Sequence, residues 1–193
     1  SSYYGYTSCY GQDVIGGGGC NTISSCYAST ISGGYVNIAS GYGLSFVGGG
    51  SQNTASGEYG VVVGGRYNIS SGSRTFVGGG RNNTASTCYD VVVGGYSNTA
   101  SGCYSFVGGG CYNEAIGCVS TISGGYYNCV QAIYGTISGG YGNCIGTNSS
   151  YSFIGGGCSN TALGCYSTIS GGYGNSVISG AYAKIGGGYQ NTL

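Results

Sequence analysis

Residues 98–113 read NTASGCYSFVGGGCYN, and residues 113–128 repeat the pattern as NEAIGCVSTISGGYYN. The Asn that follows each Gly pair recurs throughout the chain, at Asn21, Asn37, Asn53, Asn68, Asn83, Asn98, Asn113, Asn128, Asn143, Asn160, Asn175 and Asn191. We number the positions of this mostly 15-residue repeat as columns one to fifteen, with Asn in column one. A fixed internal period is typical of proteins built from stacked units.

The period and its residue types predict the fold. Fifteen residues are too few for a pair of helices, and the glycines disfavour any helix. They suit one coil of a β-solenoid, in which two short strands joined by tight turns pair with the next coil. Column ten is always Ile or Val and column three is small or aliphatic, so we expect these two columns to face each other in a thin core, with the mostly Ser column eight also inward. The sequence predicts an all-β, single parallel β-solenoid (β-roll) of about 12 coils.

The predicted solenoid spans residues 1–193 as one domain, with an irregular first coil at 1–13 and an incomplete last coil at 191–193. The Gly pair of columns twelve and thirteen, and the frequent Gly of column five, are expected to form turns with positive φ. The Asn column is expected to hydrogen-bond its own backbone and the neighbouring coil, so that a ladder of Asn side chains locks the register. A phosphate-binding loop would need a Lys or a G-x-G-x-x-G spacing, and neither accompanies these glycines.

Composition excludes several classes of function. The chain has four acidic and four basic residues and no His, so its formal net charge is zero and nothing favours nucleic acid or anionic lipid as a partner. Without His no Ser/His or Cys/His nucleophile can form, and no pair of cysteines has the spacing of a zinc site. No apolar run approaches the ~18 residues of a membrane-spanning helix. We expect no enzyme, no cofactor, no metal and no membrane partner.

Columns nine and eleven flank column ten, so they project together from the outer side of the strand. Their volumes vary as a pair, because Phe accompanies Gly and Val accompanies Val, in strict alternation from the third coil to the seventh. A packed face conserves volume in this way, whereas a solvated face has no reason to. We expect another subunit to bury this face, through Phe46, Val61, Val63, Phe76, Val91, Val93, Phe106 and Phe153. The alternative is that repeats duplicated in pairs and kept their ancestors' residues.

A known family shares this pattern. Ser105-Phe106-Val107-Gly108-Gly109, followed by Asn113, Ala115 and Gly117, resembles the head repeat of trimeric autotransporter adhesins, with its N-S-V-A-I-G-x-x-S-x-A-x-G pattern. The resemblance covers nearly the whole chain. It implies a left-handed parallel β-roll, trimers formed through the face of columns nine and eleven, and a role in surface adhesion. This chain departs from the family in its longer period, its Ile or Val at column ten, and its additional tyrosines and cysteines.

Tyrosines and cysteines also fall in columns. Tyr recurs at columns seven and fourteen, where rings one coil apart, about 4.8 Å, can form a stacked ladder or a sticky surface for sugar, mineral or another fibre. Eleven cysteines indicate an oxidising, extracellular setting. Cysteines one coil apart in the same column lie within disulfide range. The candidates are Cys129 with Cys144, and one neighbouring pair among Cys88, Cys103 and Cys118; candidates for bonds between chains are Cys9, Cys20, Cys111 and Cys158.

The chain ends and the sequons complete the set of candidate sites. Asn191, Thr192 and Leu193, followed by Ser1, Ser2, Tyr3 and Tyr4 of a second molecule, would read as one continuous coil, so we expect an end-to-end contact and an open filament. The alternative is an arbitrary boundary of the chain. Three sequons mark candidate N-glycosylation sites at Asn68, Asn82 and Asn148.

These features together predict a structural or adhesive extracellular or cell-surface fibre subunit that stacks head-to-tail and packs laterally on its own copies, with surface glycans or matrix as further candidate partners. The first alternative is an ice-binding solenoid, because Thr-Ile-Ser recurs at columns nine to eleven, although Phe, Val and Lys184 interrupt it. The second alternative is the glycan-binding head of a surface or viral fibre.

Overall fold

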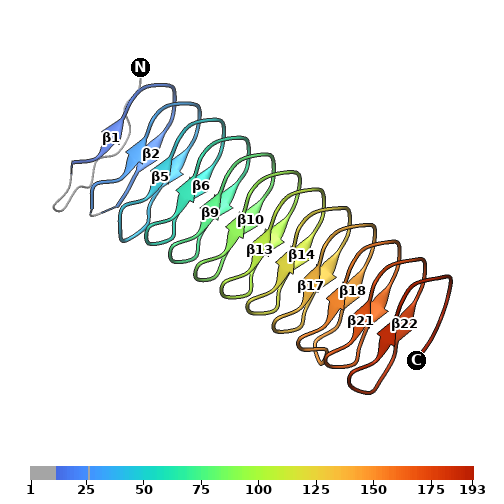
Figure 1. Cartoon of the computed structure of the whole chain (residues 1–193). Coiled ribbons are helices and arrows are strands. Elements are labelled where there is room, and N and C mark those ends of the chain that lie inside the picture. Colours follow the sequence, from blue (N-terminus) through green and yellow to red (C-terminus); the bar gives the residue numbers. More distant parts are fainter. Residues whose placement is uncertain (1–11, 26) are drawn as a thin grey trace. The chain divides into compact units, whose positions relative to one another are not determined.

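The computed structural model describes residues 12–25 and 27–193, which form an all-β parallel solenoid of about 11 turns. The described residues contain only strands of two residues each, joined by turns and bends (Figure 1). They include no helix that could cross a membrane. The chain divides into two compact units, Ser1–Ser97 and Asn98–Leu193, which we describe separately.

Each coil of the first unit contributes one strand to each of two parallel sheets, which we call the odd and even sheets. The odd sheet runs in the order β1 (Val14–Ile15), β3 (Thr30–Ile31), β5 (Phe46–Val47), β7 (Val61–Val62), β9 (Phe76–Val77) and β11 (Val91–Val92). The even sheet runs β2 (Thr22–Ile23), β4 (Ile38–Ala39), β6 (Thr54–Ala55), β8 (Ile69–Ser70) and β10 (Thr84–Ala85).

The second unit repeats this arrangement. Its odd sheet contains β13 (Phe106–Val107), β15 (Thr121–Ile122), β17 (Thr136–Ile137), β19 (Phe153–Ile154), β21 (Thr168–Ile169) and β23 (Lys184–Ile185). Its even sheet contains β12 (Thr99–Ala100), β14 (Glu114–Ala115), β16 (Cys129–Val130), β18 (Cys144–Ile145), β20 (Thr161–Ala162) and β22 (Ser176–Val177). The prediction of a parallel β-solenoid with two short strands per coil is confirmed.

Strand register follows the columns, because each residue pairs with the residue of the same column in the next coil. Val62 pairs with Val77, for example, and Val130 pairs with Ile145. In every strand the first residue faces outward and the second faces the interior. The two-residue insertion near Asn148 lies in a turn, so β17 still pairs in register with β19. Insertions therefore change the turns and leave the sheets intact.

The core is thin and consists of the predicted columns. Column ten is fully buried from Ile31 to Ile169, and column three is fully buried from Ala39 to Val177. Column eight is buried as well, which confirms its inward direction. Several of its hydroxyl groups accept from the next coil: the amide of Ser45 donates to Ser29 Oγ at 3.2 Å, and the amide of Ser167 donates to Ser152 Oγ at 3.0 Å. The buried Ser120 Oγ and Ser167 Oγ have no hydrogen-bond partner among the described residues.

The Asn column forms the predicted ladder. Within each unit, the backbone N–H of one Asn donates to the side-chain Oδ1 of the Asn one coil earlier; the bond from Asn113 to Asn98 is 3.0 Å long and that from Asn128 to Asn113 is 3.1 Å. The Nδ2 group of Asn113 donates to the carbonyls of Gly109 in its own turn and Gly125 in the next coil, both at 2.9 Å. Each buried amide is thus satisfied by groups that only correct register brings together.

Glycine is required at two columns for different reasons. Column thirteen has positive φ, as at Gly110 (φ 85°), and a Cβ there would also overlap the carbonyl oxygen of the next coil. Column five was expected to need positive φ as well, and this is wrong for most coils: Gly57 and Gly102 have no positive φ. A Cβ on Gly57 would instead overlap the carbonyl oxygen of Gly72, so the close approach of coils selects glycine at that column.

The positive φ that column five lacks occurs at columns seven and fifteen, which hold tyrosines and other L-residues. Tyr104 has φ 62°, Tyr127 has φ 55° and even the β-branched Val119 has φ 55°. At these corners the backbone N–H donates to the preceding coil: Val119 donates to Cys103 O at 2.9 Å, and Tyr127 donates to Cys111 O at 3.0 Å. Strand N–H groups donate forward, as Phe106 does to Ser120 O at 2.9 Å. The left-handed corners therefore let every coil bond its predecessor through its own donors.

We predict that Asn113→Ala lowers the free energy of unfolding by about 2–3 kcal/mol, because it removes the acceptor of the buried Asn128 amide and the donor to the Gly109 and Gly125 carbonyls, of which Gly125 O keeps its bond from the Cys111 amide. Thermal unfolding followed by circular dichroism checks this. Asn148→Ala is the matched control, since Asn148 is exposed in a turn and its loss is expected to be within about 0.5 kcal/mol. Equal destabilisation by the two substitutions would contradict a register-locking role for the ladder.

Candidate functional site

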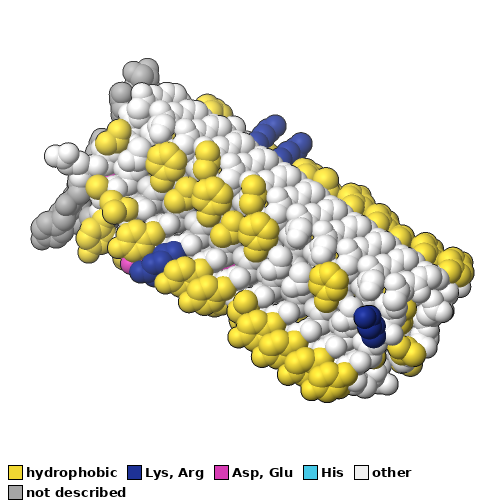
Figure 2. Space-filling view, viewed as in Figure 1, with side chains coloured by type: hydrophobic (Ala, Val, Ile, Leu, Met, Phe, Trp, Pro, Cys, Tyr) yellow, Lys and Arg dark blue, Asp and Glu magenta, His cyan; other side chains and the backbone are white. Residues whose placement is uncertain are grey.

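The outward side chains of the odd sheets form the predicted apolar face. In the first unit Phe46, Val61, Phe76 and Val91 are half-buried in the monomer, whereas Val63 and Val93 are each 47% exposed. In the second unit Phe106 and Phe153 are more than a third exposed, and threonines separate them. Figure 2 shows apolar side chains gathered in rows that cross successive coils. Burial of this face by another subunit stays a prediction.

The pairing of Phe with Gly has a cause inside the coil. A Cβ placed on Gly48 would lie 3.3 Å from Phe46 Cε1, and the corresponding distance from Gly78 to Phe76 Cε1 is 3.2 Å. Each ring therefore lies over the glycine two residues later, in the space that a side chain would fill. The paired volumes follow from this contact and do not require a partner, so the sequence argument for an interface loses its main support. The exposed valines and rings remain as its physical basis.

The odd sheets do not present a regular threonine array. In the first unit the outward column reads Val14, Thr30, Phe46, Val61, Phe76 and Val91. In the second it reads Phe106, Thr121, Thr136, Phe153, Thr168 and Lys184. Only one pair of threonines, Thr121 and Thr136, occupies neighbouring strands. This order does not suit the unbroken threonine lattice that the ice-binding alternative needs.

Stacked tyrosines line the column-seven edge of the second unit. Ring centroids are 4.7 Å apart for Tyr134 and Tyr151, 5.0 Å for Tyr151 and Tyr166, and 4.9 Å for Tyr166 and Tyr182, with interplanar angles of 13°, 3° and 10°. These separations equal the rise between coils, so the backbone sets the stacking. The predicted ladder is confirmed here, and its rings are 45–76% exposed.

A second aromatic cluster lies at columns fourteen and fifteen of the same unit. Tyr126 stacks on Tyr141 at 5.5 Å, and Tyr112 stacks on Tyr127 at 4.8 Å. Tyr126 and Tyr127 meet edge to face at 4.5 Å. Desolvation raises the pKa of Tyr126, and the neighbouring Tyr127 raises it further. The Tyr126 phenol therefore stays neutral.

In the first unit, arginine side chains occupy some positions of these aromatic columns. The Arg74 guanidinium lies 5.2 Å from the Tyr59 ring centroid and 5.5 Å from that of Tyr89, between two rings of column seven. At the other edge Arg66 lies 4.7 Å from the Tyr67 ring and Arg81 lies 5.8 Å from the Tyr96 ring. Sequence reasoning missed these cation–π contacts, although the spacing of Arg74 from Tyr59 and Tyr89 is the signal that would have found them.

The cysteines of the described residues are free thiols in this structure, and the predicted disulfide pairs stay predictions. Cys129 and Cys144 are register partners on β16 and β18, as expected, but they remain thiols. Cys111 and Cys158 lie three coils apart, with Tyr126 and Tyr141 between them, which excludes a bond between those two. The structure places Cys103 and Cys118 in the second unit, Cys88 in the first and Cys20 on its surface, while Cys9 lies outside the described residues.

The Cys129–Cys144 pair has unusual acidity. A hydrogen bond from the Cys129 thiol lowers the pKa of Cys144 to about 7, although desolvation opposes this shift. The same hydrogen bond, followed by desolvation and by the charges of Cys144 and Glu114, raises the pKa of Cys129. Cys144 is therefore the nucleophilic member of the pair at neutral pH, on the outer face of the even sheet. No cluster of three or more metal-binding side chains exists in the described part of the chain.

The sequons differ in accessibility. Asn68 belongs to the buried ladder, and its Nδ2 group donates to the carbonyls of Gly64 and Gly80, both at 2.9 Å, so glycosylation of the folded chain at Asn68 is sterically excluded. Asn82 is half-buried at a left-handed corner, and Asn148 is exposed in the turn that carries the insertion. Asn82 and Asn148 stay as predictions.

The C-terminal residues continue the repeat. Asn191 donates its N–H to Asn175 Oδ1 at 3.0 Å, Thr192 bridges Ser176, and Leu193 O accepts from the Ile178 amide at 2.8 Å. Ser1, Ser2, Tyr3 and Tyr4 lie outside the described residues. The end-to-end contact therefore stays a prediction.

We predict that Cys144 reacts with iodoacetamide with a pH midpoint near 7, because its thiolate persists to lower pH than an ordinary thiol. Cys129→Ala removes the donor, so the midpoint should rise toward the ordinary value of 9.0. Peptide-resolved mass spectrometry across pH measures both profiles. Cys118→Ala is the control and should leave the Cys144 profile unchanged; an unchanged profile in Cys129→Ala would contradict the assignment.

Comparison with known families gives one match. The family model described as Ubiquitous surface protein adhesin repeat matches residues 29–41. This short stretch contains β3, the Gly-pair turn and β4, that is, one complete strand–turn–strand segment of the repeat. No curated protein matches the chain. The segment is therefore similar to a surface-protein adhesin repeat, which fits a structural, adhesive and surface-exposed role.

Proposed function

We propose that the chain is a structural, adhesive repeat region of an extracellular surface protein, which packs laterally on copies of itself through the outer face of the odd sheets. The observation that carries the proposal is the periodic apolar surface of the first unit, where Val63 and Val93 stand exposed in coils that each follow a Phe-over-Gly coil. The match of residues 29–41 to an adhesin repeat supports the adhesive part. Trimeric packing, as the resemblance implies, is the form of self-association we favour.

Copies of the same chain are the occupants that fit this face best. Its relief alternates between Phe-Gly and Val-Val coils along strands spaced about 4.8 Å apart, and another stack with the same spacing can match it over several coils. None of the outward residues from Thr30 to Val93 on this face is charged, so burial leaves no unpaired ion. Contact over several coils would also bury apolar surface on each coil, and each burial would add to the free energy of association.

The catalytic alternatives find no support in the site. The outer face of the odd sheets consists of apolar and hydroxyl side chains, apart from Lys184 at β23. A second structural proposal, end-to-end stacking through Asn191, Thr192 and Leu193, rests on the incipient coil that these residues form. Lateral and end-to-end packing use different surfaces and can coexist.

We predict that Val63→Asp with Val93→Asp weakens self-association at least tenfold, because each substitution would bury an unpaired carboxylate at the interface. Sedimentation velocity across a concentration series measures the effect. Ile38→Asp with Ile69→Asp is the matched control, since these exposed isoleucines lie on the even sheet of the same unit. A monomeric parent chain, or equal dissociation by the two double variants, would overturn lateral packing through the odd sheets.

A further inference from the structure

The outer face of the even sheet in the second unit carries two cysteines in register. Along this face the first residues of successive strands are Thr99, Glu114, Cys129, Cys144, Thr161 and Ser176. Cys129 on β16 pairs with Cys144 on β18, and both are half-buried. They are the only cysteines in the strands of the described part of the chain. Fifteen residues separate them in sequence, so no metal-binding spacing motif reveals them, whereas the coil brings them side by side.

The two thiols form a small set of sulfur ligands. They lie close enough for the Cys129 thiol to donate a hydrogen bond to Cys144. The Gln131 side chain hydrogen-bonds the Cys129 sulfur in a way that favours its thiolate, and Glu114 on the neighbouring strand places a negative charge next to the same sulfur. This charge disfavours an anion as the ligand. The surroundings therefore suit a cation that binds sulfur.

The spacing of the strands suits an ion between the two sulfurs. A Zn–thiolate bond is about 2.3 Å long, and two bonds of similar length in a line would separate the sulfurs by about 4.6 Å. Neighbouring parallel strands lie about 4.8 Å apart, and register partners project from the same side of the sheet. A disulfide would require the sulfurs to approach to about 2.05 Å. A bridging ion therefore matches the strand spacing more closely than an S–S bond does.

The number and type of the ligands select the class of ion. No group of three or more His, Cys, Asp or Glu side chains that could hold a metal exists among residues 12–25 and 27–193. Structural Zn²⁺ takes four ligands, and Ca²⁺ and Mg²⁺ take oxygen ligands, so none of these ions suits a pair of sulfurs. Thiolates select soft ions such as Cu(I), for which two ligands in a line suffice.

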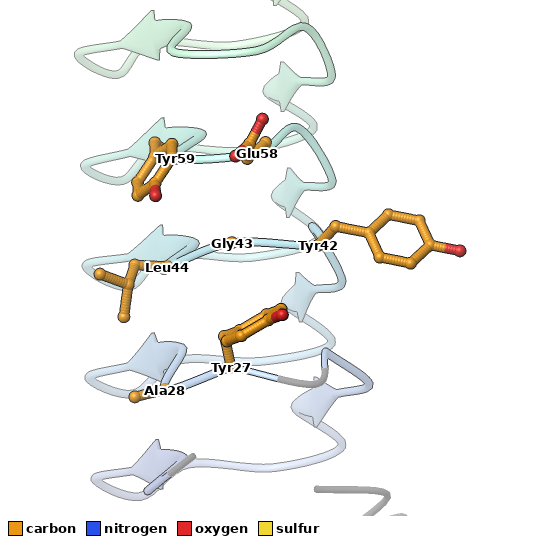
Figure 3. A pocket seen from close by; sticks show the side chains of 7 residues that line it. All are labelled: Tyr27, Ala28, Tyr42, Gly43, Leu44, Glu58 and Tyr59. Atoms are coloured by element: carbon orange, nitrogen blue, oxygen red, sulfur yellow. The ribbon is translucent and has the colours of Figure 1, made fainter. Parts of the chain in front are cut away.

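Other metal-ligating groups of the described residues offer no equivalent pair on a strand. Glu58 lines a hollow of the first unit together with Tyr27, Tyr42 and Tyr59 (Figure 3), and no other residue that lines this hollow carries a carboxylate or a sulfur. Cys103 and Cys118 share column six of neighbouring coils but lie in turns, outside the sheets. They provide the internal comparison for the strand pair.

We propose that Cys129 and Cys144 bind one soft monovalent cation, such as Cu(I), as a two-coordinate bridge between neighbouring coils. The ion takes the place of the proton that the two sulfurs share, and each sulfur binds as a thiolate. One proton therefore leaves a thiol–thiolate pair, two leave a pair of thiols, and they pass to the solvent; nothing is oxidised or reduced. This site goes beyond the proposed structural role, which uses the odd sheets.

Cysteine-resolved alkylation of the whole chain tests the bridge. The chain is reduced with a phosphine, which is then removed, and is handled without oxygen while a competing chelator sets the free Cu(I) and iodoacetamide labels the thiols. We expect Cu(I) to protect Cys129 and Cys144 together, at a free concentration at least about tenfold below that which protects Cys103 and Cys118. Zn²⁺ at the same free concentration should not protect the pair. No protection of the pair, earlier protection of Cys103 and Cys118, or equal protection by Zn²⁺ would overturn the proposal.

Variants distinguish a bridge from two separate sites. In Cys129→Ser, Cu(I) should protect Cys144 at least about tenfold more weakly, and Cys144→Ser should have the same effect on Cys129. Each variant is compared with and without Cu(I), because the loss of one thiol also changes the reactivity of the other. Cys118→Ser is the matched control, since it removes an exposed thiol from a turn of the same unit and should leave both protections unchanged.

Undiminished protection of the remaining cysteine in either variant, or an equal loss in Cys118→Ser, would refute a shared ion. Unfolding profiles check that both variants fold, and Cys129→Ser decides if Cys144→Ser misfolds. The double variant Val63→Asp with Val93→Asp alters the odd-sheet face of the first unit and leaves the cysteine pair unchanged, so it should keep the Cu(I) protection of the parent. Loss of protection in that variant would overturn the site as described.

Discussion

The hydrogen bond between the backbone of one asparagine and the side chain of the asparagine one coil earlier is the contact on which the rest of the structure depends. It joins residues that lie 15 to 17 positions apart, and it forms only if neighbouring coils are in register. The same side chain also donates hydrogen bonds to its own glycine turn and to the glycine turn of the next coil, as Asn113 does to Gly109 and Gly125. One residue per coil therefore specifies both the turn and the stack, and strands of two residues suffice because register is decided outside them.

This constraint explains the unusual composition. Columns three and ten can hold only small or medium aliphatic residues, because the two sheets of a coil lie too close for larger ones, and the core consists of Ala, Val and Ile with an occasional Ser such as Ser70. Glycine at column thirteen is needed for both positive φ and close approach, as at Gly110. Large side chains are thereby displaced to the corners and outer faces, where tyrosine dominates.

Much of this architecture could be predicted from sequence, because a column repeated in every coil averages away the ambiguity of any single residue. The buried columns, the Asn ladder and the register partners Cys129 and Cys144 were all accessible in this way. The left-handed φ of Tyr104 or Val119 was not, since neither residue type favours it and the cause is a hydrogen bond to the preceding coil.

The corners at columns seven and fifteen accept Tyr, Arg, Val, Cys, Ser, Gln and Asn in one backbone conformation. Because the N–H of the corner holds that conformation, the side chain contributes little to the fold and can be exchanged coil by coil. The fold and the surface chemistry of this protein therefore depend on different residues. The asparagines and glycines keep the coils about 4.8 Å apart, and the corner residues determine which side chain each coil presents. A substitution at a corner changes the side chain that one coil presents and leaves the spacing of the coils unchanged. A surface of this kind can therefore change its chemistry faster than its fold can change.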